Sequence, residues 1–381
     1  MAGKKSTPLM GSVRYYEGLD FRKVLSESLN VFFKDAWRVA LTNPSQAYHF
    51  LKTIRWQQKA GRIRSVWKRQ GIEVPPILIF SITNKCNLQC KGCYNWALRP
   101  SIESELDAGK LRSVIAEAHE LGISFIMIAG GEPLTRPEIL DITRDFPEIT
   151  FLVFTNGLLI TDETAGRLSK QRNFVPVLSV EGREEETDDR RGTGVYRRLQ
   201  IAVEKLENQN IFWGVSVTVT RDNFATVTDD GFVQYLADRG CKLFFFVEYT
   251  PVSEDTEDWV ITDEQREQLI SIRDSFRSRF KALFIALPKD EEEIGGCLSA
   301  GRGFVHINAA GDVEPCPFAP YSDTNIRDKS LKEALQSDFL KRIRDNHDRL
   351  SEAEGGCALW TEREWVRSLA SGRDTGETKL R

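Results

Sequence analysis

The sequence predicts an α/β protein organised around a parallel sheet, and three observations support this class. Strand-like apolar runs alternate with helix-like segments from Pro76 to about residue 290. A helical segment precedes that region, and a shorter segment with a different, cysteine-containing pattern follows it. Repeated strand–helix units form parallel sheets with right-handed crossovers, and such a sheet is either flat and doubly wound or curved into a partial barrel.

The strand pattern consists of six short apolar runs, each followed by a turn or a helix signal. These predicted strands cover residues 77–83, 125–129, 151–155, 175–180, 211–219 and 242–249. Between the first two, helically spaced apolar residues continue from Leu111 to Leu121 and stop at Gly122. Pro137 stands where proline is tolerated at the start of a helix. Ligands collect at the C-terminal ends of parallel strands, so the residues that follow these runs are candidate site residues.

Length and composition bound the possible classes. A chain of 381 residues is expected to hold two or three structural units. Its 41% hydrophobic and 28% charged residues are ordinary for a globular protein. The sequence has no apolar run of about 18 residues and no apolar segment typical of a secretion signal at its start. We therefore expect a cytoplasmic protein whose seven cysteines serve metal binding or catalysis rather than disulfides.

Residues 1–74 are predicted to form a basic helical extension. Residues 1–70 contain 14 Lys and Arg against 4 Asp and Glu, whereas the whole chain has a net charge of −4. Helically spaced apolar residues occupy 24–33 and 48–67, with a break between two helices at residues 43–45. The extension also contains Trp37, Trp56 and Trp67. Such helices could pack on the protein itself, lie on a membrane surface or bind a peptide. Nucleic acid is not an expected partner, because no recognition module accompanies the basic residues.

Three cysteines follow the first predicted strand within eight residues. Cys86, Cys90 and Cys93 have the spacing C-x3-C-x2-C. A structural zinc site usually needs four protein ligands, and a four-iron, four-sulfur cluster needs one thiolate for each iron. Three thiolates on one loop would leave one iron open to a small molecule. Structural zinc and simple buried thiols are the alternatives.

The cysteine loop and the later run Gly130-Gly131-Glu132-Pro133 together resemble the radical S-adenosylmethionine (SAM) superfamily. The resemblance covers roughly residues 75–290 and implies a partial (β/α)6, TIM-like barrel. It also implies a [4Fe-4S] cluster that binds SAM and a one-electron reductant such as flavodoxin or ferredoxin. In this family the reduced cluster cleaves SAM, and the resulting 5′-deoxyadenosyl radical abstracts hydrogen from a substrate.

The resemblance also implies where SAM is bound. The backbone at Gly130 and Gly131 would approach its methionine end, and Glu132 would contact the amino group or brace the loop. Asn156 is either a ligand contact or a turn residue. Ser179 and Glu181 match the fourth-strand contacts to ribose and methionine.

Two further positions bear on SAM. Either Arg190 or Arg191, with Arg190 preferred here, would pair with the SAM carboxylate, unless both belong to a solvated charged run. Where the family often has an aromatic residue before the last cysteine, this sequence has Gly92, which leaves Tyr94 as the candidate adenine contact.

A second group of cysteines lies in the C-terminal part. Cys297, Cys316 and Cys357 surround a predicted hairpin at 304–317 and a helix expected from Ser330 to about residue 350. This layout resembles the SPASM/twitch extensions of radical SAM enzymes, which hold an auxiliary [4Fe-4S] cluster. Cys241, another side chain, water or substrate would supply a fourth ligand. Three unrelated cysteines are the alternative.

The predicted organisation is therefore a helical extension at 1–74, a barrel at 75–290, a twitch-like domain at 291–370 and a polar tail at 371–381. The predicted function is that of a radical SAM enzyme acting on a peptide, a protein or a small molecule. Two alternatives stay open at this point. One is a peripheral membrane radical SAM enzyme that acts on a lipid, and the other is a non-enzymatic iron–sulfur or zinc protein.

Overall fold

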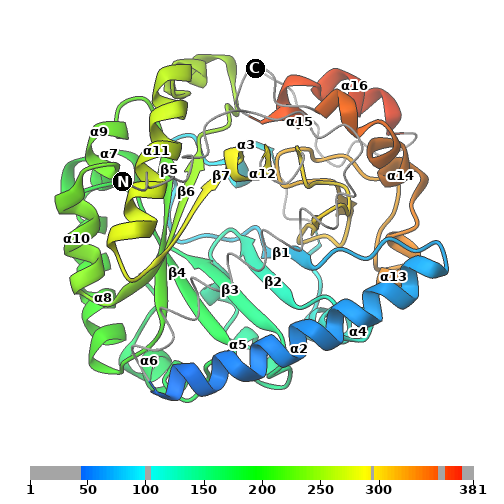
Figure 1. Ribbon diagram of the computed structural model, residues 1–381, viewed down its shortest axis with the longest axis horizontal. Coiled ribbons are helices and arrows are strands. Elements are labelled where there is room, and N and C mark those ends of the chain that lie inside the picture. The colour runs from blue at the N-terminus through cyan, green and yellow to red at the C-terminus, as the bar shows by residue number, and fades with distance from the viewer. Residues whose placement is uncertain (1–43, 99–103, 293–295, 351–356, 371–381) are drawn as a thin grey trace, which may run out of the picture.

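The structure is built on one nine-stranded sheet, in the order β7-β6-β5-β4-β3-β2-β1-β8-β9. In this computed structural model, residues 44–98, 104–292, 296–350 and 357–370 are described. Neighbouring strands are parallel except for β8 and β9, and the sheet curves without closing into a barrel (Figure 1). The strands are β1 (Ile77–Thr83), β2 (Phe125–Gly130), β3 (Thr150–Thr155), β4 (Phe174–Val180), β5 (Trp213–Val219), β6 (Cys241–Glu248), β7 (Leu283–Leu287), β8 (Phe304–Ile307) and β9 (Val313–Glu314).

Helices cover the convex side of the curved sheet (Figure 1). Those of the central region are α3 (Tyr94–Leu98), α4 (Ala108–Leu121), α5 (Ile139–Arg144), α6 (Asp162–Leu168), α7 (Glu184–Arg191), α8 (Val195–Asn208), α9 (Phe224–Val227), α10 (Asp230–Asp238), α11 (Asp263–Arg279) and α12 (Lys289–Glu292). Short 3-10 turns occupy Pro133–Thr135 and Glu254–Trp259. The expected strand–helix alternation is present, and the partial barrel that the resemblance implied is confirmed.

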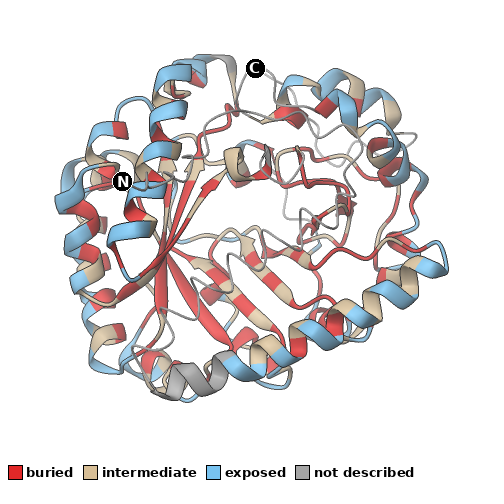
Figure 2. Ribbon diagram, viewed as in Figure 1, coloured by how far each residue is buried: buried red, intermediate tan, exposed pale blue. Residues whose placement is uncertain are grey.

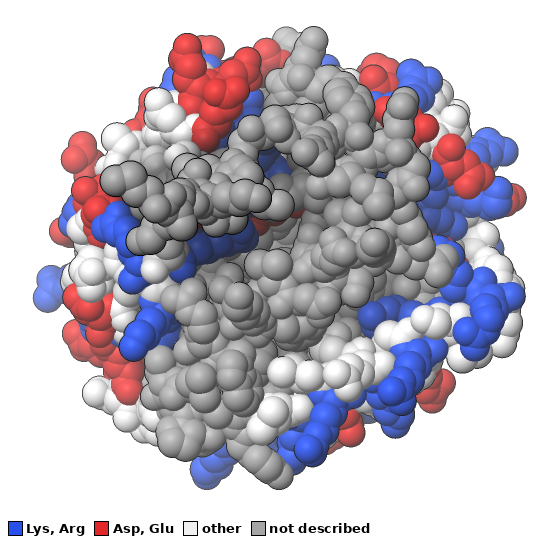
Figure 3. All heavy atoms as spheres, in the orientation of Figure 1, with Lys and Arg blue, Asp and Glu red and all other residues white. Residues whose placement is uncertain are grey.

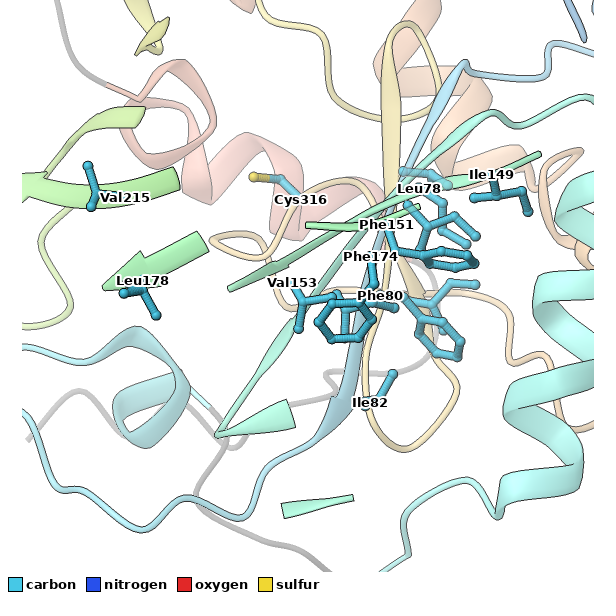
Figure 4. Close-up of a cluster of buried hydrophobic side chains, with 14 of the residues drawn as sticks. Leu78, Phe80, Ile82, Ile149, Phe151, Val153, Phe174, Leu178, Val215 and Cys316 are labelled. Carbon is cyan, nitrogen blue, oxygen red and sulfur yellow. The ribbon is translucent and has the colours of Figure 1, made fainter. Parts of the chain in front are cut away.

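The two faces of the sheet separate a packed core from an internal cavity. Strand residues alternate between faces, and the buried apolar side chains of β1 are Leu78, Phe80 and Ile82. These side chains lie beside Phe151 and Val153 of β3 in the hydrophobic cluster (Figure 4). Buried residues, in red, alternate with half-buried residues along β2 and β3, whereas β4 is buried almost throughout (Figure 2). The intervening residues, such as Ile77 and Ile79, line the cavity instead.

Three sequence expectations for this region need correction. The sequence analysis missed β7, because a five-residue apolar run that ends before a proline has too little periodicity to be recognised. The fifth strand begins at Trp213, two residues later than predicted. The predicted C-terminal hairpin exists as β8 and β9, but β8 also pairs in parallel with β1 and so extends the main sheet.

A chain of buried polar side chains crosses the seam between β1 and β8. The Ser81 hydroxyl lies 2.8 Å from His306 Nε2, and His306 Nδ1 lies 2.7 Å from Glu314 Oε2. Asn308 Nδ2 donates to the other Glu314 oxygen at 2.7 Å. All four side chains are buried, and buried polar groups cost stability unless they are hydrogen-bonded. The network therefore stabilises this register of the C-terminal segment on the barrel.

The C-terminal segment continues from β9 into short helices beyond the β1 edge (Figure 1). The single helix expected from Ser330 to about residue 350 is instead divided into α13 (Leu331–Ala334), α14 (Asp338–Asp345) and a 3-10 turn at His347–Leu350. The interruption has a local cause, because the Ser337 side chain caps α14 by accepting the Leu340 N–H. The final helices are α15 (Ala358–Thr361) and α16 (Arg363–Leu369).

The extension is represented by α2 (Pro44–Arg69), which packs on the protein itself. Trp56 is buried and stacks on His119 of α4, with ring centroids 4.5 Å apart. Lys332 of α13 lies over the ring of Trp67, 4.4 Å from its centroid. Lysine and arginine side chains follow the outer side of α2 (Figure 3). Trp37 and the helix expected at 24–33 lie outside the described residues.

We predict that Glu314→Ala lowers the free energy of unfolding by about 3 kcal/mol. The substitution removes the buried carboxylate that both His306 Nδ1 and Asn308 Nδ2 contact, and an unsatisfied buried polar group costs about 1–3 kcal/mol. The urea dependence of tryptophan fluorescence measures the loss. The matched control is Glu204→Ala, which removes an exposed carboxylate on α8 and should change stability little. Equal stability of both variants would contradict a stabilising role for the network.

Candidate functional site

One cavity of about 640 Å³ extends along the inner face of the sheet, from the starts of β1 and β2 to the strand ends, and both cysteine groups line it. The predicted site residues on its wall are Cys86, Cys90, Cys93, Tyr94, Gly130, Gly131, Glu132, Asn156, Ser179, Arg190, Cys297, Cys316 and Cys357. Glu181 is the one predicted residue that lies behind the wall rather than on it. The deeper part of the wall consists of apolar strand residues, including Met127, Leu152, Phe154 and Ile285.

The first cysteine loop is anchored at both ends. After β1, Thr83 Oγ1 and the Asn84 N–H each donate to Glu105 Oε1 at 2.8 Å. Further along, the Lys91 N–H donates to the carbonyl of Arg190 at 2.9 Å. The chain then enters α3, where the Ala97 N–H donates to the Cys93 carbonyl. These bonds hold the three thiols at the cavity. Their close spacing along the chain would not by itself fix their positions.

The glycine pair after β2 packs directly against the backbone of this loop. The Gly131 N–H donates to the Thr83 carbonyl at 2.7 Å, and the Glu132 N–H donates to the Lys85 carbonyl at 2.8 Å. A Cβ on Gly130 would lie 2.2 Å from the Thr83 oxygen, and one on Gly131 would lie 2.1 Å from the Lys85 oxygen. Glycine is therefore required here for close approach of two backbone segments.

Glu132 and Asn156 connect the second and third strand ends to the cysteine loop. The buried Glu132 carboxylate accepts hydrogen bonds from Leu134 N–H, from Thr155 Oγ1 and from Asn156 N–H. Both of its oxygens are thus already in use for bracing. The Asn156 side chain donates to Asn87 Oδ1 at 2.7 Å, and its amide nitrogen lies 3.9 Å from Cys86 Sγ. Asn156 therefore reaches the cysteine loop in addition to shaping its own turn.

Glu181 pairs with both candidate arginines at once. Its Oε1 accepts from Arg190 Nη1 at 2.6 Å and from Arg191 Nε at 2.7 Å, and the carboxylate is 1% exposed. Arg191 Nη1 lies 3.9 Å from Cys90 Sγ, and Arg190 Nε donates to the Lys91 carbonyl. One buried carboxylate thus holds two guanidinium groups beside the cysteine loop, and Arg191 is a site residue in addition to Arg190.

Aromatic rings occupy the space beside Gly92. A Cβ on this residue would lie 2.7 Å from the ring of Trp259 and 2.7 Å from the hydroxyl oxygen of Tyr249, so no larger side chain fits there. Tyr249 follows β6, lines the cavity, and has a buried hydroxyl with no hydrogen-bond partner among the described residues. Tyr94 packs edge-to-face on Phe318 of the C-terminal segment, with centroids 5.3 Å apart. Tyr249 and Trp259 could not be found from the sequence, because they are distant in the chain.

The second cysteine group is assembled from three separate elements. Cys297 precedes β8, Cys316 follows β9, and Cys357 stands at the N-terminus of α15. Cys297 and Cys316 each interact electrostatically with Cys357, and Figure 4 shows Cys316 beside the hydrophobic cluster of the sheet. Cys241 is not part of the group. Its thiol is buried at the start of β6 and donates to the Leu243 carbonyl at 3.4 Å.

Glu291 of α12 joins this second group, and the sequence analysis did not identify it. The side chain lines the same cavity, and its Oε2 accepts the N–H of Leu298, the residue after Cys297. Burial raises the pKa of the Glu291 carboxyl to about 7. The residue lies in an acidic run of the sequence, where nothing distinguishes it from exposed glutamates.

The donor chemistry fits two iron–sulfur clusters. Burial raises the pKa of the Cys86 thiol to about 11 and raises those of Cys297 and Cys316 well above the usual value. Such thiols bind metal only by losing their protons to it, which a coordinated iron ion promotes. Among the described residues, no three His, Cys, Asp or Glu side chains converge on a single metal ion. Each thiol triplet would supply three of the four ligands of a four-iron cluster.

Two family models match the chain. The radical SAM superfamily model matches residues 80–237, and the SPASM model, an iron–sulfur cluster-binding domain, matches residues 297–358. The first therefore contains Cys86, Cys90 and Cys93, and the second contains Cys297 and Cys316 and extends through Cys357.

Two curated relatives are similar to this chain over most of its length. The AdoMet-dependent heme synthase of Methanosarcina barkeri is 25% identical over 312 residues, which cover 75% of this chain and 88% of that protein. The mycofactocin maturase MftC of Mycobacterium tuberculosis is 29% identical over 268 residues, covering 66% of each chain. Both relatives are named as enzymes.

Solved structures show the same fold. Streptococcus suis SuiB bound to its precursor peptide SuiA has a TM-score of 0.60 at 19% identity, covering 79% of this chain and 72% of that chain. The structure of anSMEcpe with bound AdoMet has a TM-score of 0.55 at 19% identity, covering 80% and 92%.

We predict that Gly131→Ala reduces the iron bound at the first cysteine loop without unfolding the chain. The new methyl group would displace the backbone at Lys85 and with it the start of the loop. Iron content after anaerobic reconstitution is the measurement, with circular dichroism to confirm folding. Gly166→Ala is the control, because a Cβ on that α6 residue meets no atom within 4 Å. Full iron loading of the Gly131 variant would show that the glycine packing does not position the loop.

Proposed function

The chain is a radical SAM enzyme with a C-terminal SPASM domain, and we propose that it abstracts hydrogen from a peptide or a small molecule bound in its cavity. We further propose that Cys86, Cys90 and Cys93 hold the cluster that binds SAM, and that Cys297, Cys316 and Cys357 hold an auxiliary cluster. The observation that carries this proposal is that both triplets line one cavity, whose remaining wall is mostly apolar.

The chain's own residues have separable tasks in this proposal. The three loop thiols leave one iron of the first cluster open, and that cluster with SAM supplies a carbon-centred radical able to take hydrogen from an unactivated carbon. Arg190 and Arg191, held by Glu181, place positive charge beside the loop, where a carboxylate of SAM would be attracted. Glu132 and Asn156 keep the loop in place through their hydrogen bonds.

The lining of the cavity indicates the kind of substrate. Its deeper wall is formed by side chains such as Met127, Leu152 and Phe154, which favour an apolar group and exclude water. A reactive radical intermediate needs such a dry site, because water and other side reactions compete for it. We infer that the reacting part of the substrate is apolar, whether it belongs to a peptide side chain or to a small molecule. The relatives named above as a maturase and a heme synthase represent these two classes.

The sequence led us to expect two kinds of partner, an electron donor and a membrane surface. A reductant such as flavodoxin or ferredoxin is proposed as the electron donor, because the chemistry needs one electron for each SAM cleaved. A membrane contact through the N-terminal extension is not supported by α2, whose Trp56 is buried against α4. Among the described residues, no helix has the length and hydrophobicity to cross a membrane.

We predict that the anaerobically reconstituted protein forms 5′-deoxyadenosine from SAM in the presence of dithionite. The triple variant Cys86→Ala/Cys90→Ala/Cys93→Ala should form none, because it lacks the thiols for the first cluster. Liquid chromatography with mass detection measures the product. A fully cluster-loaded parent chain that leaves SAM intact would favour the non-enzymatic alternative.

Iron and sulfide counts on the same proteins provide the control. The parent chain should contain about eight irons and the triple variant about four, because a four-iron cluster is lost. The complementary variant Cys297→Ala/Cys316→Ala/Cys357→Ala should also contain about four.

The substrate class can be tested with separated extracts of the source cells. Fractions ordered by polarity are added to the loaded enzyme, and the rate of 5′-deoxyadenosine formation is measured. We expect stimulation by fractions that contain apolar peptides or apolar small molecules, because these fit the cavity wall. Stimulation by strongly polar, highly charged fractions alone would contradict the proposed substrate class.

A further inference from the structure

Glu291 is a buried carboxylate at the site proposed for the auxiliary cluster. It lies in α12, just after β7, and is 8% exposed. Its Oε2 accepts the N–H of Leu298, the residue after Cys297, and the carboxylate interacts electrostatically with Cys297 and Cys316. It lines the cavity together with Cys297, Cys316 and Cys357. An oxygen donor therefore stands with the three thiols on the wall of one cavity.

The surroundings of Glu291 fix its position but do not neutralise it by an ion pair. The Leu298 N–H donates to Glu291 Oε2 at 2.9 Å, and the Gly296 N–H donates to the Glu291 backbone carbonyl at 3.0 Å. No lysine or arginine within the described ranges forms an ion pair with this carboxylate. Arg302 interacts electrostatically with Glu291, but its guanidinium donates to the Cys297 carbonyl. A buried carboxylate is ordinarily paired with a cation or bound to a metal.

The number of thiols points in the same direction. The chain has seven cysteines, of which three lie on the first loop, three lie beside Glu291, and Cys241 is buried in the core of the sheet. No fourth cysteine is therefore available to the second group. A four-iron cluster has four irons to be ligated, and the described residues place a carboxylate, rather than a cysteine, next to the three thiols.

We propose that Glu291 is the fourth protein ligand of the auxiliary cluster, beside Cys297, Cys316 and Cys357. The inference rests on the proposed function, which assigns a cluster to these three cysteines. Its consequence is that no iron of this cluster is open to direct binding of the substrate. One iron would carry a carboxylate oxygen, which is a harder ligand than the thiolates on the other three irons.

The test uses the full chain with only the auxiliary cluster present. The parent is Cys86→Ala/Cys90→Ala/Cys93→Ala, and Glu291→Ala or Glu291→Gln is added to it. Gln keeps an oxygen to accept the Leu298 N–H, so it preserves local structure while removing the anionic donor. Iron content and electron paramagnetic resonance spectra are recorded after reconstitution, after mild oxidation with ferricyanide, and after addition of 2-mercaptoethanol. Glu364→Ala on the exposed side of α16 is the matched control.

We expect the parent and the control to keep about four irons after oxidation and to show no spectral response to the thiol. After oxidation, both Glu291 variants should lose about one iron per chain and show the signal of an oxidised three-iron cluster. Without oxidation, their spectra should change when the thiol binds the opened iron. Unchanged iron and spectra in both Glu291 variants would overturn the inference while leaving the auxiliary cluster established. A thiol response in the parent itself would overturn it too, because the fourth iron would already be open. A parent without cluster iron would overturn both the inference and the proposed auxiliary cluster.

Discussion

The pairing of β1 with β2 on one side and with β8 on the other is the constraint on which the site depends. β1 leads into the first cysteine loop, β2 leads into the glycine pair that packs against that loop, and the segment that contains Cys297 precedes β8. Because β1 and β2 run in the same direction, the first cysteine loop and the glycine pair come together at their C-terminal ends, whereas Cys297 and Cys316 lie toward the other end of the β1–β8 pair. The buried contacts of Ser81, His306 and Glu314 hold this seam, so the second cysteine group has a fixed relation to the first.

Positive charge is placed beside the first cysteine loop by only a few contacts. Three thiols, once deprotonated by iron, place negative charge in a partly buried loop, and burial alone disfavours that state. Arg190 and Arg191 offset it from the end of α7, and the shared carboxylate of Glu181 keeps both arginines from turning to solvent. The connection is direct, because the Lys91 backbone exchanges hydrogen bonds with Arg190.

In the second cysteine group, negative charge on the thiolates would be still more deeply buried. Cys297 and Cys316 are more buried than the loop cysteines, and nearby acidic charge makes their ionisation harder still. A metal centre there would be both the partner that makes thiolates stable and the cation that a buried Glu291 otherwise lacks. Binding of a metal there would therefore stabilise the folded arrangement of Cys297, Cys316 and Glu291.

Local sequence patterns determined much of this protein, because they depend on neighbours along the chain. The first strand was predicted with its observed bounds, five others within two residues, and the two cysteine groups by their spacing and the order of motifs. Gly131 was recognised as a residue that permits close approach, although its contact is with the cysteine loop. Capping at Ser337, by contrast, divided a helix that apolar spacing had predicted to be continuous.

Only the tertiary structure decided the relations between distant segments. The parallel pairing of β8 with β1, the joint pairing of Arg190 and Arg191 with Glu181, and the rings of Tyr249 and Trp259 beside Gly92 join residues far apart in the sequence. Glu291 is the clearest case, because its acidic neighbours make it look like a solvated residue. Its burial beside Cys297 follows from how α12 packs, and no local pattern records that packing.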